Sequence, residues 1–156
     1  VEGLKSVEGG YNRTGSRSPM QWDDSTNAGF SSAPASDLYI AMDPDKDRPT
    51  AKKEMAAPDS LYHEVKKLIR IRQSHKALQS RGKITFVYAE KNAYPLAYIR
   101  EDGDEKILVI INAAAEAKTF ACDAEPKEAI YNFGAAAEAK NGKITVPAQS
   151  AGFYRI

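Results

Sequence analysis

The chain has 156 residues, 22 of them basic and 21 acidic, which gives a formal net charge of +1. This balance provides no electrostatic reason to expect nucleic acid or an anionic membrane as a partner. No apolar run reaches the roughly 18 residues of a membrane-spanning helix. Apolar residues make up 42% of the chain and charged residues 28%, ordinary globular values that allow one large domain, or one small domain with an attached segment.

The only cysteine, Cys122, excludes an intramolecular disulfide and favours a reducing, cytoplasmic location. We interpret it as a small core residue, because nothing in the sequence marks a partner base that would activate a nucleophile. The chain opens on Val1-Glu2-Gly3 without a signal peptide, and we expect it to be a piece of a longer protein.

Residues 1–57 show no sustained hydrophobic period and are rich in Gly, Ser, Asn, Asp and Pro, which is typical of loops and turns. A structureless segment of this length is uncommon in a compact domain, so we expect it to pack on residues outside the chain. Three aspartates, Asp43, Asp45 and Asp47, superficially follow calcium-loop spacing. Pro44 interrupts this spacing, and Arg48 stands where such a loop needs glycine. We therefore predict a solvated acidic loop and assign no metal residue, with a calcium site as the less favoured alternative.

Residues 59–75 are predicted to form a helix. Four apolar residues at i, i+4, i+7 and i+8 form one stripe along it, namely Leu61, Val65, Leu68 and Ile69. Asp59 and Ser60 supply residue types that cap helix N-termini. Basic residues crowd the C-terminal half, where the helix dipole favours cations.

From about residue 83 the hydrophobic period becomes two, which predicts β-strands. The run 107–111 is continuously apolar, as expected of a strand buried on both faces. Two hairpin turns are predicted, at Asp102-Gly103-Asp104 and at Asn141-Gly142. The other predicted strands are 84–89, 96–100, 119–122, 129–133, 143–146 and 152–156. Short strands at this spacing indicate a small antiparallel sandwich.

The most informative segment is Arg17-Ser18-Pro19-Met20-Gln21-Trp22-Asp23-Asp24, followed by Asn27-Ala28-Gly29-Phe30-Ser31. It combines a cation, an amide, carboxylates and the only tryptophan, and such groups recognise sugars. The alternative is that Trp22, Met20 and Phe30 are core anchors under a long loop, while Arg17 and Asp23 form an internal ion pair. For the three apolar side chains we prefer the core interpretation.

This segment closely resembles the R-[ST]-P-M-Q-W-D…N-A-G-F motif of family 13 glycoside hydrolases of the oligo-1,6-glucosidase, α-glucosidase and trehalose-synthase type. Residues 9–16 resemble its lead-in, and residues 58–72 resemble the last helix of the family's (β/α)₈ barrel. The resemblance implies a mainly β chain, in which a C-terminal antiparallel β-sandwich follows one α-helix and a long irregular loop. Residues 1–76 would be the remnant of the catalytic barrel, and residues 77–156 the sandwich domain.

The family carries out catalysis with an Asp nucleophile, a Glu acid/base and a third Asp in an Asn-His-Asp motif. This sequence has no such motif, and its histidines, His63 and His75, belong to the predicted helix. The resemblance therefore places no catalytic residue in this chain and implies no cofactor. It assigns Arg17 to the glucose at the −1 subsite. Gln21 and Asp23 are further substrate-binding candidates, expected mainly to fix the loop.

The implied parent is a retaining α-glucosidase, or a transglycosylating relative, that acts on short α-glucosides. The expected partners are the remainder of the barrel, the α-glucoside substrate and, through the helix stripe, a second copy of the chain. The stretch Thr50-Ala51-Lys52-Lys53-Glu54 differs from many relatives, so the subfamily stays open. The alternative function is an independent non-catalytic sandwich that binds carbohydrate or protein, which would expose aromatics on one sheet face.

Overall fold

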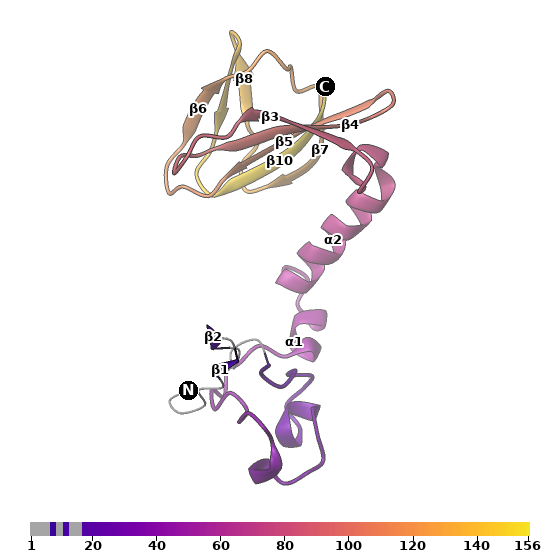
Figure 1. The fold of residues 1–156 in the computed structure, drawn as a ribbon, viewed down its shortest axis with the longest axis vertical. Helices are drawn as coiled ribbons and strands as arrows, with labels where there is room; N and C mark the ends of the chain where they lie inside the picture. Colours follow the sequence, from indigo (N-terminus) through magenta and orange to yellow (C-terminus); the bar gives the residue numbers. More distant parts are fainter. Residues whose placement is uncertain (1–6, 9–10, 13–16) are drawn as a thin grey trace. The chain divides into compact units, whose positions relative to one another are not determined.

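The computed structural model of the protein describes residues 7–8, 11–12 and 17–156 (Figure 1). The chain divides into two compact units, Val1–Lys67 and Leu68–Ile156, called here the N-terminal unit and the sandwich unit. The boundary falls inside helix α2 (Leu61–Ser74). No helix within the described part of the chain is both long and apolar enough to cross a membrane.

The N-terminal unit is largely irregular, as predicted, and contains only short elements. Strands β1 (Val7–Glu8) and β2 (Tyr11–Asn12) pair antiparallel. Two 3₁₀ turns follow, η2 (Thr26–Gly29) and η3 (Ala35–Asp37).

A helix that the sequence pattern did not reveal, α1 (Ala51–Ala56), lies within the segment expected to be loop. Six residues are too few to show a helical period. Its N-cap is Thr50, which is buried and whose hydroxyl accepts a hydrogen bond from the Lys53 N–H at 3.2 Å.

Helix α2 confirms the helix predicted over 59–75. The Ser60 hydroxyl donates to the Glu54 carbonyl and so secures the end of α1. The apolar stripe is open to solvent, with Leu61 73% exposed, Val65 45% and Ile69 51%. Within the part of the chain that the structure describes, these three side chains are therefore largely uncovered, whereas Leu68 is half-buried. The spacing of the stripe is nevertheless that of a helix packed on a core.

The sandwich unit consists of two antiparallel sheets that face each other (Figure 1). The five-stranded sheet has the order β3-β4-β5-β10-β7, and the three-stranded sheet has the order β6-β9-β8. The strands of the first are β3 (Lys83–Tyr88), β4 (Leu96–Asp102), β5 (Glu105–Asn112), β10 (Ser150–Arg155) and β7 (Glu128–Phe133). Those of the second are β6 (Lys118–Ala121), β9 (Lys143–Val146) and β8 (Glu138–Lys140).

All seven predicted strands and both predicted hairpins are present. Strand β8 was not predicted, because its three residues are all exposed and show no alternation. The turn that joins it to β9 explains why it pairs. Asn141 and Gly142 have φ of 51° and 69° and link the paired residues Lys140 and Lys143, as in a two-residue hairpin turn.

The core of the sandwich lies between the sheets. The five-stranded sheet contributes Ala97, Leu108, Ile110 and Tyr154, and the opposite sheet and its following loop contribute Phe120, Ile144, Val146 and Cys122. A second cluster, centred on Ala77, Ile107 and Val109, covers part of the other face of the large sheet. Residues 107–110 are therefore buried on both faces, which confirms the expectation from their continuous apolar run.

The connection from α2 to the sandwich is held by two charged side chains of the large sheet. The Glu105 carboxylate contacts His75 Nδ1 at 2.6 Å through Oε1 and accepts the Ala77 N–H at 2.9 Å through Oε2. The Arg100 guanidinium donates to the carbonyl oxygens of Ala77, Gln79 and Gly82 at 3.1, 2.6 and 3.0 Å. These bonds anchor the 3₁₀ turn η4 (Lys76–Leu78) on β4 and β5.

Candidate substrate-contacting loop

The Gln21–Phe30 loop closes on itself through an unusual backbone turn. Three consecutive residues, Asn27, Ala28 and Gly29, have φ of 50°, 53° and 71°. The Ala28 carbonyl, turned inward by this path, accepts the N–H groups of Trp22 at 2.8 Å and Asp23 at 3.2 Å. A left-handed conformation costs a residue with a side chain about 1–2 kcal/mol, and such strain persists only where the surroundings enforce it.

The loop also binds the beginning of helix α1. The carbonyl oxygens of Gln21 and Trp22 accept the Ala51 and Lys52 N–H groups, each at 2.9 Å. These are first-turn amides that have no partner inside a helix, so the loop and the helix satisfy each other. An ion pair between Asp24 and Lys53 at 3.1 Å, with both side chains about half exposed, joins the same two segments.

The Asp23 carboxylate is engaged within the loop. Its Oδ1 accepts both the N–H of Ser25, at 2.8 Å, and the Ser25 hydroxyl. These two hydrogen bonds, with a smaller contribution from the Lys52 ammonium, lower the pKa of Asp23 below its ordinary value. Asp23 therefore stays charged, and one of its oxygens is committed to holding the turn.

Asn27 orders the stretch that follows. Its side-chain Nδ2 donates to the carbonyl oxygens of Ser31 at 2.9 Å and Ala33 at 2.7 Å. An amide with two donors in one group is suited to this double contact. Asn27 therefore has two roles. It adopts the first left-handed conformation of the turn, and its side chain fixes the backbone of residues 31–33. Asn27 belongs to the sequence motif, but the motif did not predict the hydrogen bonds of its side chain to Ser31 and Ala33.

The three predicted substrate-binding residues lie along one short segment. Arg17 is exposed, while Gln21 and Asp23 are half-buried. The Gln21 Oε1 atom is buried and has no hydrogen-bond partner within the described part of the chain. A buried carbonyl oxygen left unpaired costs about 1–3 kcal/mol, so this amide is poised to accept a hydrogen bond.

The interpretation of Met20, Trp22 and Phe30 as core anchors is wrong for this chain. They are 49%, 52% and 48% exposed. The interior of the turn is filled by the small side chain of Ala28, which is 1% exposed, so the larger apolar side chains lie outside it.

The acidic stretch forms ordinary side-chain turns. Asp43 Oδ1 accepts the Asp45 N–H at 3.0 Å, and Asp45 Oδ1 accepts the Asp47 N–H at 2.9 Å. All three aspartates are exposed, in agreement with the solvated loop expected from the sequence. No group of three or more His, Cys, Asp or Glu residues suited to a metal ion is found among the residues that the structure describes.

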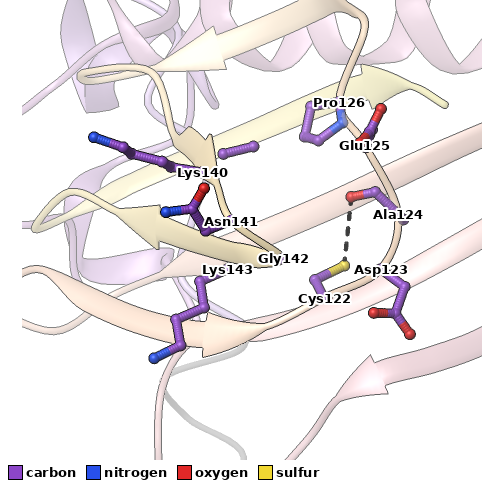
Figure 2. A pocket seen from close by; sticks show the side chains of 10 residues that line it. Cys122, Asp123, Ala124, Glu125, Pro126, Lys140, Asn141, Gly142 and Lys143 are labelled. Atoms are coloured by element: carbon purple, nitrogen blue, oxygen red, sulfur yellow. Dashed lines mark hydrogen bonds between the residues drawn. The ribbon is translucent and has the colours of Figure 1, made fainter.

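Cys122 lies in the core at the end of β6, beside a cavity of about 430 Å³ formed with the β8–β9 turn (Figure 2). Its Sγ is 3.7 Å from the Ala124 carbonyl oxygen. Burial raises the pKa of the thiol, which disfavours the thiolate that a nucleophile requires. The predicted role as a small core residue is confirmed.

Replacing Gly29 by alanine should disturb the loop. A Cβ at this position would lie 2.9 Å from Asp23 Oδ1 and 3.2 Å from the Trp22 Cβ, at φ of 71°. We expect the N-terminal unit to lose about 1–2 kcal/mol and the emission of Trp22, the only tryptophan, to shift. Fluorescence spectra and urea titrations measure both. Gly103→Ala is the control, because Gly103 has φ of 58° but no atom within 4 Å of the added carbon. Unchanged Trp22 emission in Gly29→Ala would contradict the expectation.

Comparisons with known proteins agree with this architecture. The family model of the alpha-amylase catalytic domain matches residues 2–81. The chain is 30% identical over 135 residues to a glucan 1,6-alpha-glucosidase of Streptococcus pneumoniae, covering 86% of this chain and 24% of that protein. It is 34% identical over 108 residues to an oligo-1,6-glucosidase of Parageobacillus thermoglucosidasius, covering 69% of this chain and 18% of that protein.

Among solved structures, the chain is similar to the trehalulose synthase MutB of Pseudomonas mesoacidophila, with a TM-score of 0.76 and 30% identity. The similarity covers 92% of this chain and 26% of that one. The chain thus spans about a quarter or less of the length of these relatives. The match of the family model to about half of the residues, in the part that contains the Arg17–Phe30 motif and helix α2, shows that the chain belongs to the alpha-amylase family of glycoside hydrolases.

Proposed function

We propose that this chain forms the end of the catalytic barrel and the C-terminal sandwich of a glycoside hydrolase that acts on α-glucosidic bonds of short oligosaccharides. The observation that carries the proposal is the Gln21–Phe30 loop, which combines a left-handed turn with a charged Asp23 and a Gln21 side-chain oxygen that is unpaired within the described part of the chain. Enforced backbone strain beside polar groups is a feature of binding sites. The names of the matched relatives, glucosidases for 1,6-linked substrates, supply the substrate class.

Within this proposal Arg17 contacts the sugar, and Gln21 and Asp23 support it. Arg17 is exposed just before the Gln21–Phe30 loop, where its planar guanidinium can donate to hydroxyl groups. Asp23 Oδ1 accepts two hydrogen bonds from Ser25, so we expect Asp23 mainly to stabilise the conformation of the loop. The Gln21 Oε1 atom can accept from a hydroxyl or from a neighbouring segment of the barrel.

We further propose residues 1–76 as the barrel remnant and residues 77–156 as the sandwich domain. The match to the catalytic-domain family ends at residue 81, close to this boundary. The rest of the barrel would cover the stripe of Leu61, Val65 and Ile69, which is exposed here. Such burial contributes about 1.5–3 kcal/mol for each fully covered side chain.

The independent binding module is the weaker candidate. The sandwich does expose aromatic side chains, with Phe86 60% and Phe133 53% exposed. However, Phe86 and Phe133 lie on β3 and β7, the two opposite edge strands of the large sheet, so they do not form one aromatic platform. The matched relatives are named as glucosidases, which favours the enzyme.

The 156-residue chain should be inactive by itself, because the Asp, Glu and Asp set that the family uses is not supplied by its sequence. Incubation of the purified chain with maltose, isomaltose, sucrose or an aryl α-glucoside should release no glucose above the buffer level. The complete enzyme, assayed in parallel, should cleave at least one of these substrates. Turnover by the chain that survives repurification would show that the catalytic groups lie within it.

The uncovered helix stripe should make the isolated chain self-associate. Sedimentation velocity should show a mass that rises with concentration, and Ile69→Glu should return the chain to a monomer because a charge opposes apolar burial. Arg70→Glu, on an exposed position next to it, is the control. A strict monomer at high concentration would oppose this expectation.

A further inference from the structure

The outer face of the five-stranded sheet, which points away from the three-stranded sheet, contains a cavity of about 460 Å³. It lies where the end of β5, the start of β10 and the end of β7 meet. Ala151 is paired with Ile111 on one side and with Phe133 on the other. Paired residues of neighbouring strands point to the same face, so a small side chain here stands between two large ones. This size difference creates the hollow.

Two special backbone positions shape the rim of the cavity. Gln149 has φ of 46°, a left-handed value that is uncommon for a residue with a side chain. Gly134 has φ of 70°, and a Cβ there would lie 3.2 Å from the Gln149 carbonyl oxygen. The two turns therefore press together, and this contact brings Phe133 and the Gln149 side chain to the same cavity.

Asn112, which also lines the cavity, is held by several hydrogen bonds. The Asn112 side chain is buried and donates to the carbonyl oxygens of Glu116, Val146 and Pro147 at 3.0, 3.1 and 2.8 Å. Its Oδ1 accepts the Ala114 N–H at 3.1 Å. Because both Nδ2 and Oδ1 of Asn112 already have partners, the exposed Gln149 is the amide of this lining that can contact a ligand.

The lining has the chemistry of a site for an uncharged, amphipathic ligand. Among residues 17–156, no charged side chain lines the cavity. The Phe133 ring is 53% exposed and has no ring partner among residues 17–156, and no residue in that range hydrogen-bonds the Gln149 side-chain amide. An open aromatic face beside an amide that both donates and accepts matches one apolar face and the hydroxyl groups of a pyranose. The volume is in the range of small-molecule sites.

We propose that this cavity binds a neutral hexopyranose unit, with Phe133 stacking on the ring and Gln149 contacting its hydroxyls. The inference rests on the sandwich unit alone and does not depend on the activity proposed above. The site would hold an α-glucan chain on the sandwich in addition to any contact made by the Arg17 loop.

The test is binding of maltotriose and isomaltotriose to the 156-residue chain, measured by saturation-transfer NMR and by titration calorimetry. We expect dissociation constants on the order of 1 mM. Phe133→Ala should weaken binding by about fivefold to tenfold. Ala151→Leu should abolish it, because leucine fills the hollow without removing a contact group. Gln149→Gly should also weaken binding while relieving the left-handed strain, so the loss cannot come from unfolding.

Phe86→Ala is the matched control. Phe86 is an exposed phenylalanine on β3, the opposite edge of the same sheet, and its removal should leave binding unchanged. The proposal is overturned if no saccharide binds, if Phe133→Ala and Phe86→Ala weaken binding equally, or if Arg17→Ala abolishes it, since the sugar would then occupy the N-terminal loop.

Discussion

Arg17→Ala should lower kcat/KM of the complete enzyme by roughly tenfold to a hundredfold, whereas Gln21→Ala should lower it less. A guanidinium that donates to a sugar hydroxyl in a desolvated site contributes about 1.5–3 kcal/mol. Gln21 offers one neutral acceptor oxygen, which contributes less. Arg17→Lys should restore little activity, because an ammonium does not reproduce the planar fork. Steady-state kinetics on a short α-1,6-glucoside measure these effects.

If Arg17 has a purely structural role, stability and activity should change together. If Arg17 only held the loop through Asp23 or Asp24, Arg17→Ala would lower the melting temperature together with activity, and Asp23→Ala would behave identically. Asp23 accepts a hydrogen bond from Ser25, and Asp24 forms an ion pair with Lys53, so both carboxylates stabilise the loop. We therefore expect Asp23→Ala to lower stability and activity together, and Arg17→Ala to lower activity more, and the melting temperature less, than Asp23→Ala does. Near-normal turnover in Arg17→Ala would remove Arg17 from the binding site.

Glu105→Gln should destabilise the sandwich unit by about 1–3 kcal/mol near neutral pH. Burial by itself would raise the pKa of Glu105. The Ala77 N–H and the His75 imidazole, with a contribution from Arg155, outweigh burial and lower the pKa. Glutamine keeps an acceptor for Ala77 but loses the charge that His75 and Arg155 face. Urea unfolding followed by far-UV circular dichroism measures the loss.

The effect of Glu105→Gln should depend on pH with a defined sign. Because the folded-state pKa of Glu105 lies below its ordinary value, its stabilisation is present above that ordinary value and is lost as pH falls through the folded pKa. The difference between the two proteins should therefore shrink below about pH 4. Glu101→Gln is the control, since the more exposed Glu101–Lys106 pair in the same hairpin should contribute less than about 1 kcal/mol. A pH-independent difference would assign the loss to packing.

Several features of this protein could be predicted from local patterns. The run 107–111 predicted a strand buried on both faces because no residue in it is polar, and β5 has that environment. The hairpin at Asn141-Gly142 followed from the preference of these residues for positive φ. The Arg17–Asp23 string indicated the family, and the match to the alpha-amylase catalytic domain confirmed it.

Other features depend on contacts between residues far apart in the sequence, and no local period reports such contacts. The first amides of helix α1 donate to the carbonyl oxygens of Gln21 and Trp22, which lie about 30 residues earlier in the chain. This contact stabilises the beginning of the helix. The sequence predicted His75 only as a residue at the end of the helix. In the structure its Nδ1 atom lies 2.6 Å from Oε1 of Glu105 on β5, a residue 30 positions further along the chain.

The sequence by itself determined helix α2, seven strands of the sandwich and the turns of two hairpins, because these follow from side-chain periodicity and backbone preference. The motif at Arg17–Asp23 indicated the family. Only the tertiary structure decided that Trp22 and Phe30 lie outside the turn they flank, and that Ala151 opens a hollow beside Phe133. These outcomes depend on the sizes of side chains that are neighbours across strands and turns. Such side chains become neighbours only when the strands pair and the turns pack.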